Sequence, residues 1–189
     1  MVAANAACFD NPKWRVIAMG FSTESWFNDG QVAGTGGIDN PQRYHLMVGQ
    51  PYYRFANSTS DEVAQAGGGW WVEFDQFLVI KDFARRNGYT LCDAARLFLA
   101  LPYQWTRVDR LWTATLQLPL DAYAGFGKTA EVRSKPGTEG DRWTPMQHIK
   151  VRQLYIPGLV CDRTREDRKT PNLYETAFGS RSWTYAATA

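Results

Sequence analysis

The sequence predicts an α+β fold in which most strands pair antiparallel. Apolar residues recur at helical spacing between residues 60 and 101, and they alternate with polar residues, as in strands, after residue 110. The pattern does not show the regular strand–helix–strand order that is typical of a parallel sheet. With 189 residues, 44% hydrophobic and 14% aromatic, the chain is expected to fold as one domain, 1–189, whose core spans 46–160.

The first segment, residues 1–45, is expected to be irregular, with one short strand at Trp14–Met19 between turn signals. A strand follows at His45–Phe55, where aromatic side chains favour extended backbone. The next element is a short helix at Ser60–Ala66, and the three glycines at Gly67–Gly69 are expected to end it.

The middle of the chain predicts one strand and two helices. Trp70–Phe74 has the composition of a strand, and Gln76–Asn87 carries apolar residues at helical spacing. Thr90 is placed to cap a second helix at Leu91–Leu101, which Pro102 ends.

The second half of the chain is dominated by strand patterns. Arg110–Leu118 alternates clearly, and His148–Ile156 alternates again. Between them we expect a turn-rich crossing at Pro119–Gly127 and an exposed loop at 133–145. The C-terminal segment, 161–189, is expected to be a weakly specified tail.

Composition argues against several kinds of site and partner. The net charge of +2 does not indicate nucleic-acid binding. The cysteines Cys8, Cys92 and Cys161 are scattered, and two histidines argue against a histidine metal centre. There is no apolar run near 20 residues and no basic-then-apolar leader. We therefore expect a soluble protein without membrane contact and without a classical secretion signal.

Common catalytic signatures are missing from the sequence. There is no GxSxG nucleophile motif. Gly125–Thr129 is similar to the end of a phosphate-binding loop, but Ala122 stands where the first glycine of that loop is required.

One arginine stands out, because Arg54 ends an aromatic run immediately before a polar turn. The planar guanidinium of an arginine in such a place is suited to bind a phosphate. The stretch Tyr53–Gly68 resembles the opening motif of bacterial ADP-ribosyltransferase toxins, in the cholera and pertussis toxin group and in the pierisin and scabin group. In that motif the arginine holds the phosphates of NAD and supports the strand ends, so the resemblance implies both roles for Arg54.

A second stretch, Val151–Val160, resembles the last motif of the same families. Aligned on Gly158, it puts Gln153 at the position of the catalytic glutamate and Val151 at the first position of that motif. The middle motif, Ser-Thr-Ser on a strand before a helix, is not recognisable, and Gly69–Phe74 occupies its place.

This resemblance, which covers residues 50–160, implies a split antiparallel β-sandwich with early helices and an NAD cleft between its sheets. Arg54 and Gln153 are the implied catalytic residues. The other residues expected to contact NAD lie near the arginine or in the place of the middle motif: Phe55, Ala56, Trp70, Trp71 and Phe74. Val151 and Tyr155 are expected to contact the acceptor, and no metal is implied.

Gln153 carries no charge, whereas cleavage of the nicotinamide–ribose bond needs a carboxylate to stabilise an oxocarbenium-like transition state. Three explanations are open. The chain is a form inactivated by a Glu→Gln change at position 153, or it uses another acid such as Glu73, Glu131 or Glu139, or it is a binding protein without activity. Val151 argues against arginine as the acceptor, because arginine-modifying members carry Glu or Gln there.

The implied activity is that of an NAD-dependent mono-ADP-ribosyltransferase toxin or effector, with NAD as substrate. The alternatives are an NAD glycohydrolase toxin and a catalytically inactive binding protein of the same fold. The expected partners are a macromolecular acceptor in the target cell, either protein or nucleic acid, and a cognate immunity protein. The protein would be secreted or injected and would act in the target-cell cytoplasm.

Overall fold

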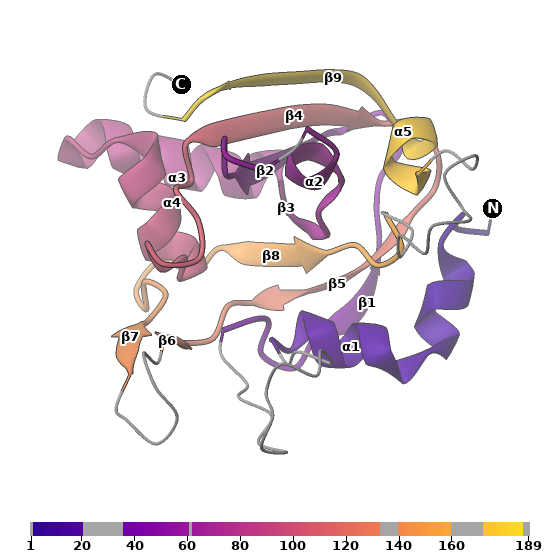
Figure 1. Cartoon of the computed structure of the whole chain (residues 1–189), viewed down its shortest axis with the longest axis horizontal. Helices are drawn as coiled ribbons and strands as arrows, with labels where there is room; N and C mark the ends of the chain where they lie inside the picture. The colour runs from indigo at the N-terminus through magenta and orange to yellow at the C-terminus, as the bar shows by residue number, and fades with distance from the viewer. Residues whose placement is uncertain (1, 21–35, 61, 133–139, 160–171, 187–189) are drawn as a thin grey trace.

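A computed structural model describes residues 2–20, 36–60, 62–132, 140–159 and 172–186 (Figure 1). The helices are η1 (Ala6–Asp10), α1 (Pro12–Ala18), α2 (Glu62–Gly67), α3 (Phe74–Asn87), α4 (Leu91–Leu99) and α5 (Leu173–Ala177). The strands are β1 (Gln42–His45), β2 (Pro51–Ala56), β3 (Trp70–Glu73), β4 (Arg110–Leu116), β5 (Asp121–Phe126), β6 (Ala130–Val132), β7 (Asp141–Trp143), β8 (Arg152–Tyr155) and β9 (Phe178–Tyr185).

The described strands form a seven-stranded sheet in the order β1-β5-β8-β3-β2-β4-β9 and a separate pair, β6-β7. Every described pairing is antiparallel, which confirms the predicted α+β class. The four-residue strand β3 joins the two halves of the large sheet. Its end at Val72 and Glu73 pairs with β2, while its beginning at Trp70 and Trp71 pairs with β8.

Three apolar clusters cover the two faces of the sheet. One face is buried in a core to which both halves contribute, including Trp112 of β4 and Leu154 of β8. On the other face, α3 and α4 pack over Val72 and Leu111, and lie together beside one part of the sheet in Figure 1. On that same face α1 covers Tyr155 of β8.

The helices α2, α3 and α4 form close to where the sequence predicts them. Thr90 caps α4 as expected, because its hydroxyl accepts a hydrogen bond of 3.1 Å from the amide of Asp93. In α3, the helix begins at Phe74, so this residue belongs to the helix and not to the preceding strand. Gly88, with φ of 70°, ends α3 in the left-handed conformation that glycine adopts without strain.

The strand predicted at Trp14–Met19 is wrong, because residues Pro12–Ala18 form the helix α1. Pro12 occupies the first turn, where its missing N–H costs nothing, and the Asn11 side chain accepts a hydrogen bond from the amide of Lys13. Helical geometry also brings Trp14 of α1 against Tyr155, with the ring centroids 6.5 Å apart, and Ile17 packs against the same apolar cluster.

Several predicted boundaries are also wrong. The strand expected at His45–Phe55 is two strands, β1 and β2, separated by a turn. The crossing expected at Pro119–Gly127 contains the paired strand β5. In the expected tail, residues 172–186 form α5 and the eight-residue strand β9, and within 133–145 the described residues include β7. The partners of β1, β5 and β9 are distant in sequence, so local pattern gave little indication of these strands, whereas β7 pairs with the nearby β6.

The N-terminal segment is fastened to the sheet by one buried side chain. The Asn5 amide nitrogen donates to the main-chain oxygens of Asp121 and Pro157, at 2.8 and 3.1 Å, and its oxygen accepts from the amide of Asp121 at 2.9 Å. Since these groups are buried, each lost bond leaves a polar atom unsatisfied.

We predict that Asn5→Ala lowers the free energy of unfolding by about 3 kcal/mol, roughly 1 kcal/mol for each buried hydrogen bond. Urea denaturation followed by circular dichroism measures the change. Asn87→Ala is the control, because the Asn87 side chain is exposed and donates one hydrogen bond to Phe83, so its change should stay below about 1 kcal/mol. Equal effects of the two substitutions would contradict this assignment.

Candidate functional site

Arg54 lies in β2 and uses its guanidinium to join two neighbouring elements. Nε donates to the main-chain oxygen of Gln65 in α2 at 2.7 Å, and Nη1 donates to that of Trp70 in β3 at 2.9 Å. Burial lowers the pKa of Arg54 to about 10, so the side chain is still a cation at neutral pH. A Cβ at Gly68 would collide with Nη2, which explains why glycine occupies this close approach. Arg54 thus ties β2 to α2 and to the start of β3, and its contact with NAD phosphates stays a prediction.

The structure does not bring Arg54 and Gln153 together in one cleft. Residues paired across antiparallel strands share a face, and side chains alternate along each strand. Tyr52 pairs with Glu73, and Trp71 pairs with Leu154. Arg54 therefore shares its face with Glu73, Trp71 and Leu154, whereas Gln153 lies on the opposite face.

Gln153 is buried, with 7% of its surface exposed, and its amide packs against Gly127. Among the described residues, its Nε2 has no hydrogen-bond partner. Val151 is buried as well and borders a cavity of about 290 Å³ that also includes Lys150. Tyr155 packs between Trp70 and Trp14, with ring centroids 5.1 and 6.5 Å away. Neither Val151 nor Tyr155 presents a surface to an acceptor here.

The residues expected to line an NAD pocket do not come together in one cavity either. Ala56 and Trp71 are buried in the core, and Trp71 stacks on Phe178 at 4.9 Å. Trp70 and Phe55 are partly buried and pack against apolar neighbours. Phe74 differs from them, because it is 45% exposed and lines a cavity.

That cavity, of about 290 Å³, lies where β3 ends and α3 begins, and we call it the Glu73 pocket. Its lining residues come from β1, β2 and the turn between them, and from β3, α3 and β8: Tyr44, Met47, Gln50, Pro51, Tyr52, Glu73, Phe74, Asp75 and Arg152. Glu73 was among the alternative acids predicted from the sequence. Of the others, Glu131 lies in β6, outside the large sheet, and Glu139 lies outside the described residues.

Glu73 is held by two side chains from other strands. Arg152 Nε donates to Glu73 Oε2 at 3.0 Å, and Arg152 Nη2 is bonded to the same oxygen. The Tyr44 hydroxyl donates to Glu73 Oε1 at 2.9 Å, and the Arg152 guanidinium lies 4.5 Å from the Tyr44 ring centre. The main-chain amide of Arg152 also donates to Gln76 Oε1, which fixes β8 to α3. These contacts orient the carboxylate at the pocket wall.

The Glu73 carboxylate keeps Tyr44 and Arg152 protonated, so both can donate hydrogen bonds to it. Burial alone would lower the pKa of Arg152, but the hydrogen bond and charge of Glu73 raise it. Burial raises the pKa of Tyr44, and the hydrogen bond to Glu73 raises it further. At neutral pH a guanidinium and a neutral phenol therefore face Glu73.

Sequence reasoning missed Tyr44, Asp75 and Arg152. Arg152 lies next to Gln153 in the stretch that resembles the last motif. Neighbouring residues of a strand point to opposite faces of the sheet, so the alignment on Gln153 drew attention away from Arg152. Tyr44 gave no local signal, because its partner in the pocket, Glu73, is 29 residues away along the chain.

Further observations narrow the chemistry of the described part of the chain. Its His, Cys, Asp and Glu residues do not form a group of three suited to hold a metal ion. Within the same residues, helices long and apolar enough to cross a bilayer are absent. No protein-family model, curated protein or solved structure matches the chain.

We predict that Arg54→Lys lowers the free energy of unfolding by about 2 kcal/mol, because one ammonium cannot replace the planar fork that reaches both carbonyl oxygens. Thermal and urea unfolding would measure the loss. Arg86→Lys, at an exposed i,i+4 ion pair with Asp82, is the matched control and should change stability by less than about 0.5 kcal/mol. If Arg54→Lys leaves the free energy of unfolding unchanged, the two hydrogen bonds do not support the sheet.

Proposed function

We propose that the chain is an NAD-dependent mono-ADP-ribosyltransferase of the toxin or effector type, in which Glu73 supplies the catalytic carboxylate. The observation that carries the proposal is the Glu73 pocket, where a fixed carboxylate from the face that bears Arg54, an arginine and the exposed ring of Phe74 line one cavity. In this proposal Gln153 has no catalytic charge to supply and packs as a structural residue.

The arrangement of strands supports this proposal. The resemblance puts its first motif on the strand of Arg54 and its last motif on the strand of Gln153, and the strand between them, before a helix, occupies the place of the middle motif, which is not recognisable. These are β2, β3 and β8, which are neighbours in the sheet in the order β8-β3-β2. Both halves of the sheet contribute to one core, as expected if they form the two parts of a split sandwich around β3.

The chemistry of the Glu73 pocket suits the nicotinamide end of NAD. The oxidised nicotinamide ring is a cation, and the exposed aromatic surface of Phe74 favours a cation. When the glycosidic bond breaks, its electron pair leaves with nicotinamide, which becomes neutral, and positive charge develops on the ribose. The Glu73 carboxylate stabilises that charge, and it then accepts the proton of the nucleophile that bonds to the ribose carbon.

Arg152 and Tyr44 position Glu73 in this scheme. Their hydrogen bonds hold the carboxylate in one orientation before the substrate binds, which reduces the reorganisation needed in the transition state. A pocket of about 290 Å³ has room for one ring and its ribose, so the rest of the dinucleotide would extend beyond it.

One observation favours NAD glycohydrolase activity as a second candidate. The residues that the resemblance assigns to the acceptor, Val151 and Tyr155, are 3% and 7% exposed and lie on the opposite face from Glu73. Water reaches an open pocket without a dedicated acceptor surface, and it would take the place of the macromolecular acceptor.

We predict that the purified chain releases nicotinamide from NAD and that Glu73→Gln lowers the rate at least about 100-fold, as expected for loss of a charge that stabilises the transition state. Chromatography of the reaction measures nicotinamide, and addition of candidate acceptor proteins or nucleic acids separates transfer from hydrolysis. Glu131→Gln, which removes a carboxylate from β6, should keep the wild-type rate.

Two outcomes would contradict the proposal. Absence of nicotinamide release from the folded wild-type chain would support a binding protein. Release by Gln153→Glu, with none from the wild type, would return the catalytic position to residue 153 and identify the chain as an inactivated form.

A further inference from the structure

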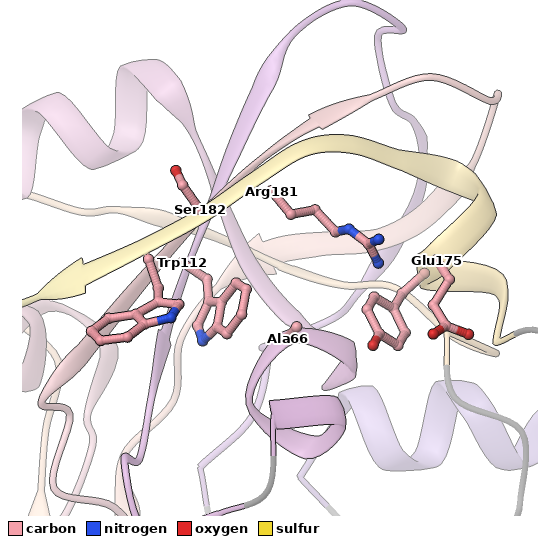
Figure 2. A pocket seen from close by; sticks show the side chains of 7 residues that line it. Ala66, Trp112, Glu175, Arg181 and Ser182 are labelled. Atoms are coloured by element: carbon pink, nitrogen blue, oxygen red, sulfur yellow. The ribbon is translucent and has the colours of Figure 1, made fainter.

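A second cavity, of about 580 Å³, lies between α2, α5 and the strands β4 and β9, and we call it the Trp112 cavity (Figure 2). It is lined by Ala66, Trp112, Tyr174, Glu175, Arg181, Ser182 and Trp183. None of these residues lines the Glu73 pocket, so the two are separate sites. The resemblance to ADP-ribosyltransferases assigns no role to any of them.

An unsatisfied hydrogen-bond donor lies in the wall of this cavity. Trp112 is only 4% exposed, and in the described part of the chain its indole Nε1 has no hydrogen-bond partner. A buried N–H without an acceptor is costly, and most native structures satisfy it. Because the indole borders an open volume, a bound ligand that offers an acceptor atom would remove that cost.

Besides Trp112, the cavity is lined by an exposed aromatic side chain, Trp183, and by a cation, Arg181. Trp183, 42% exposed, is fixed from one side by the Arg110 guanidinium, which lies 3.4 Å from the ring centre. Figure 2 shows the Arg181 side chain extending from β9 toward α5. There the Arg181 guanidinium lies 5.4 Å from the centre of the Tyr174 ring, and the residues described include no ion-pair partner for it.

The cavity is also lined by one carboxylate, that of Glu175. Glu175 is in the first turn of α5, where its Oε2 accepts a hydrogen bond of 2.8 Å from the main-chain amide of Asn172. This bond holds an acceptor group at the rim of the cavity, close to where the Arg181 cation extends. A ligand here meets, in one volume, an exposed aromatic face, a buried N–H donor, a guanidinium and a carboxylate.

We propose that the Trp112 cavity binds a nucleoside monophosphate. The base stacks on Trp183 and accepts the hydrogen bond of Trp112 Nε1. Arg181 binds the phosphate with its planar fork, and Glu175 accepts hydrogen bonds from the ribose hydroxyls. A volume of about 580 Å³ is within the range of pockets that enclose small molecules, and it suits one nucleotide. The proposal does not depend on NAD cleavage at Glu73.

Isothermal titration calorimetry of the full chain with AMP tests the proposal. AMP is expected to bind with one-to-one stoichiometry, and Trp112→Phe, which keeps a ring and removes the N–H, should weaken binding about tenfold. Trp105→Phe is the matched control, because Trp105 does not line the cavity, and it should leave the affinity unchanged.

A second variant keeps the test independent of folding at the buried Trp112. Arg181 is exposed, so Arg181→Gln should fold normally; it should weaken AMP about tenfold and leave the weaker binding of adenosine unchanged. Failure of AMP to bind at millimolar concentration, or equal affinity of the Trp112→Phe and wild-type chains, would overturn the proposal.

Competition separates two sources of the nucleotide. If NAD displaces AMP and Trp112→Phe weakens both, the site holds the nucleotide half of the dinucleotide. If NAD binds without displacing AMP, the site takes a free nucleotide. Glu73→Gln should leave AMP affinity unchanged in either case, so loss of nicotinamide release in that variant does not bear on this site.

Discussion

The two ends of β3 are each held by an arginine from a neighbouring strand, and the rest of the structure depends on this arrangement. At the start of β3, the Arg54 guanidinium binds the carbonyl oxygen of Trp70. At its end, Glu73 binds Arg152 of β8. Only four residues of β3 connect the two halves of the large sheet. Without these side-chain contacts, the two halves of the sheet would be held together only by two residue pairs between β3 and β2 and two between β3 and β8.

This arrangement also explains where the two candidate sites lie. Since Arg54 and Glu73 project from one face of adjacent strands, the same face carries the Glu73 pocket near one end of β2 and, across β4, the Trp112 cavity. Arg54 and Trp112 are cross-strand partners, so the arginine that closes α2 against β3 also supports a wall of the Trp112 cavity. The opposite face is covered by α3, α4 and α1.

Part of the fold could be predicted from sequence because its signals are local. The helical spacing before Asn87, the Thr90 cap and the alternation after Arg110 all reflect interactions within a few residues. The strands β5 and β9 were missed because distant partners stabilise them. In β5, for example, Gly125 allows close approach of Ile38, which a turn-rich composition does not reveal.

The site was harder to predict, because it depends on strand register. The sequence motif selected Gln153, yet a shift of one residue along β8 moves a side chain to the other face of the sheet. Arg152 therefore reaches Glu73 while Gln153 packs against Gly127. Glu73 and Phe74 were named from the sequence, but their convergence with Tyr44 depends on β1 and β3, which are separated by β5 and β8 in the sheet.

The decisive measurement is native-state hydrogen exchange, followed by NMR, at the amides of Trp71 and Val72. It shows whether the contacts of Arg54 and Arg152 with the two ends of β3 hold this strand in place. If these contacts hold β3, both amides open only with a free energy close to that of global unfolding. In Glu73→Gln, exchange in β3 should accelerate relative to exchange in α4, because the ion pair to β8 is weakened. Exchange of Trp71 and Val72 in the wild type at the rate of exposed turns would show that these contacts do not hold β3.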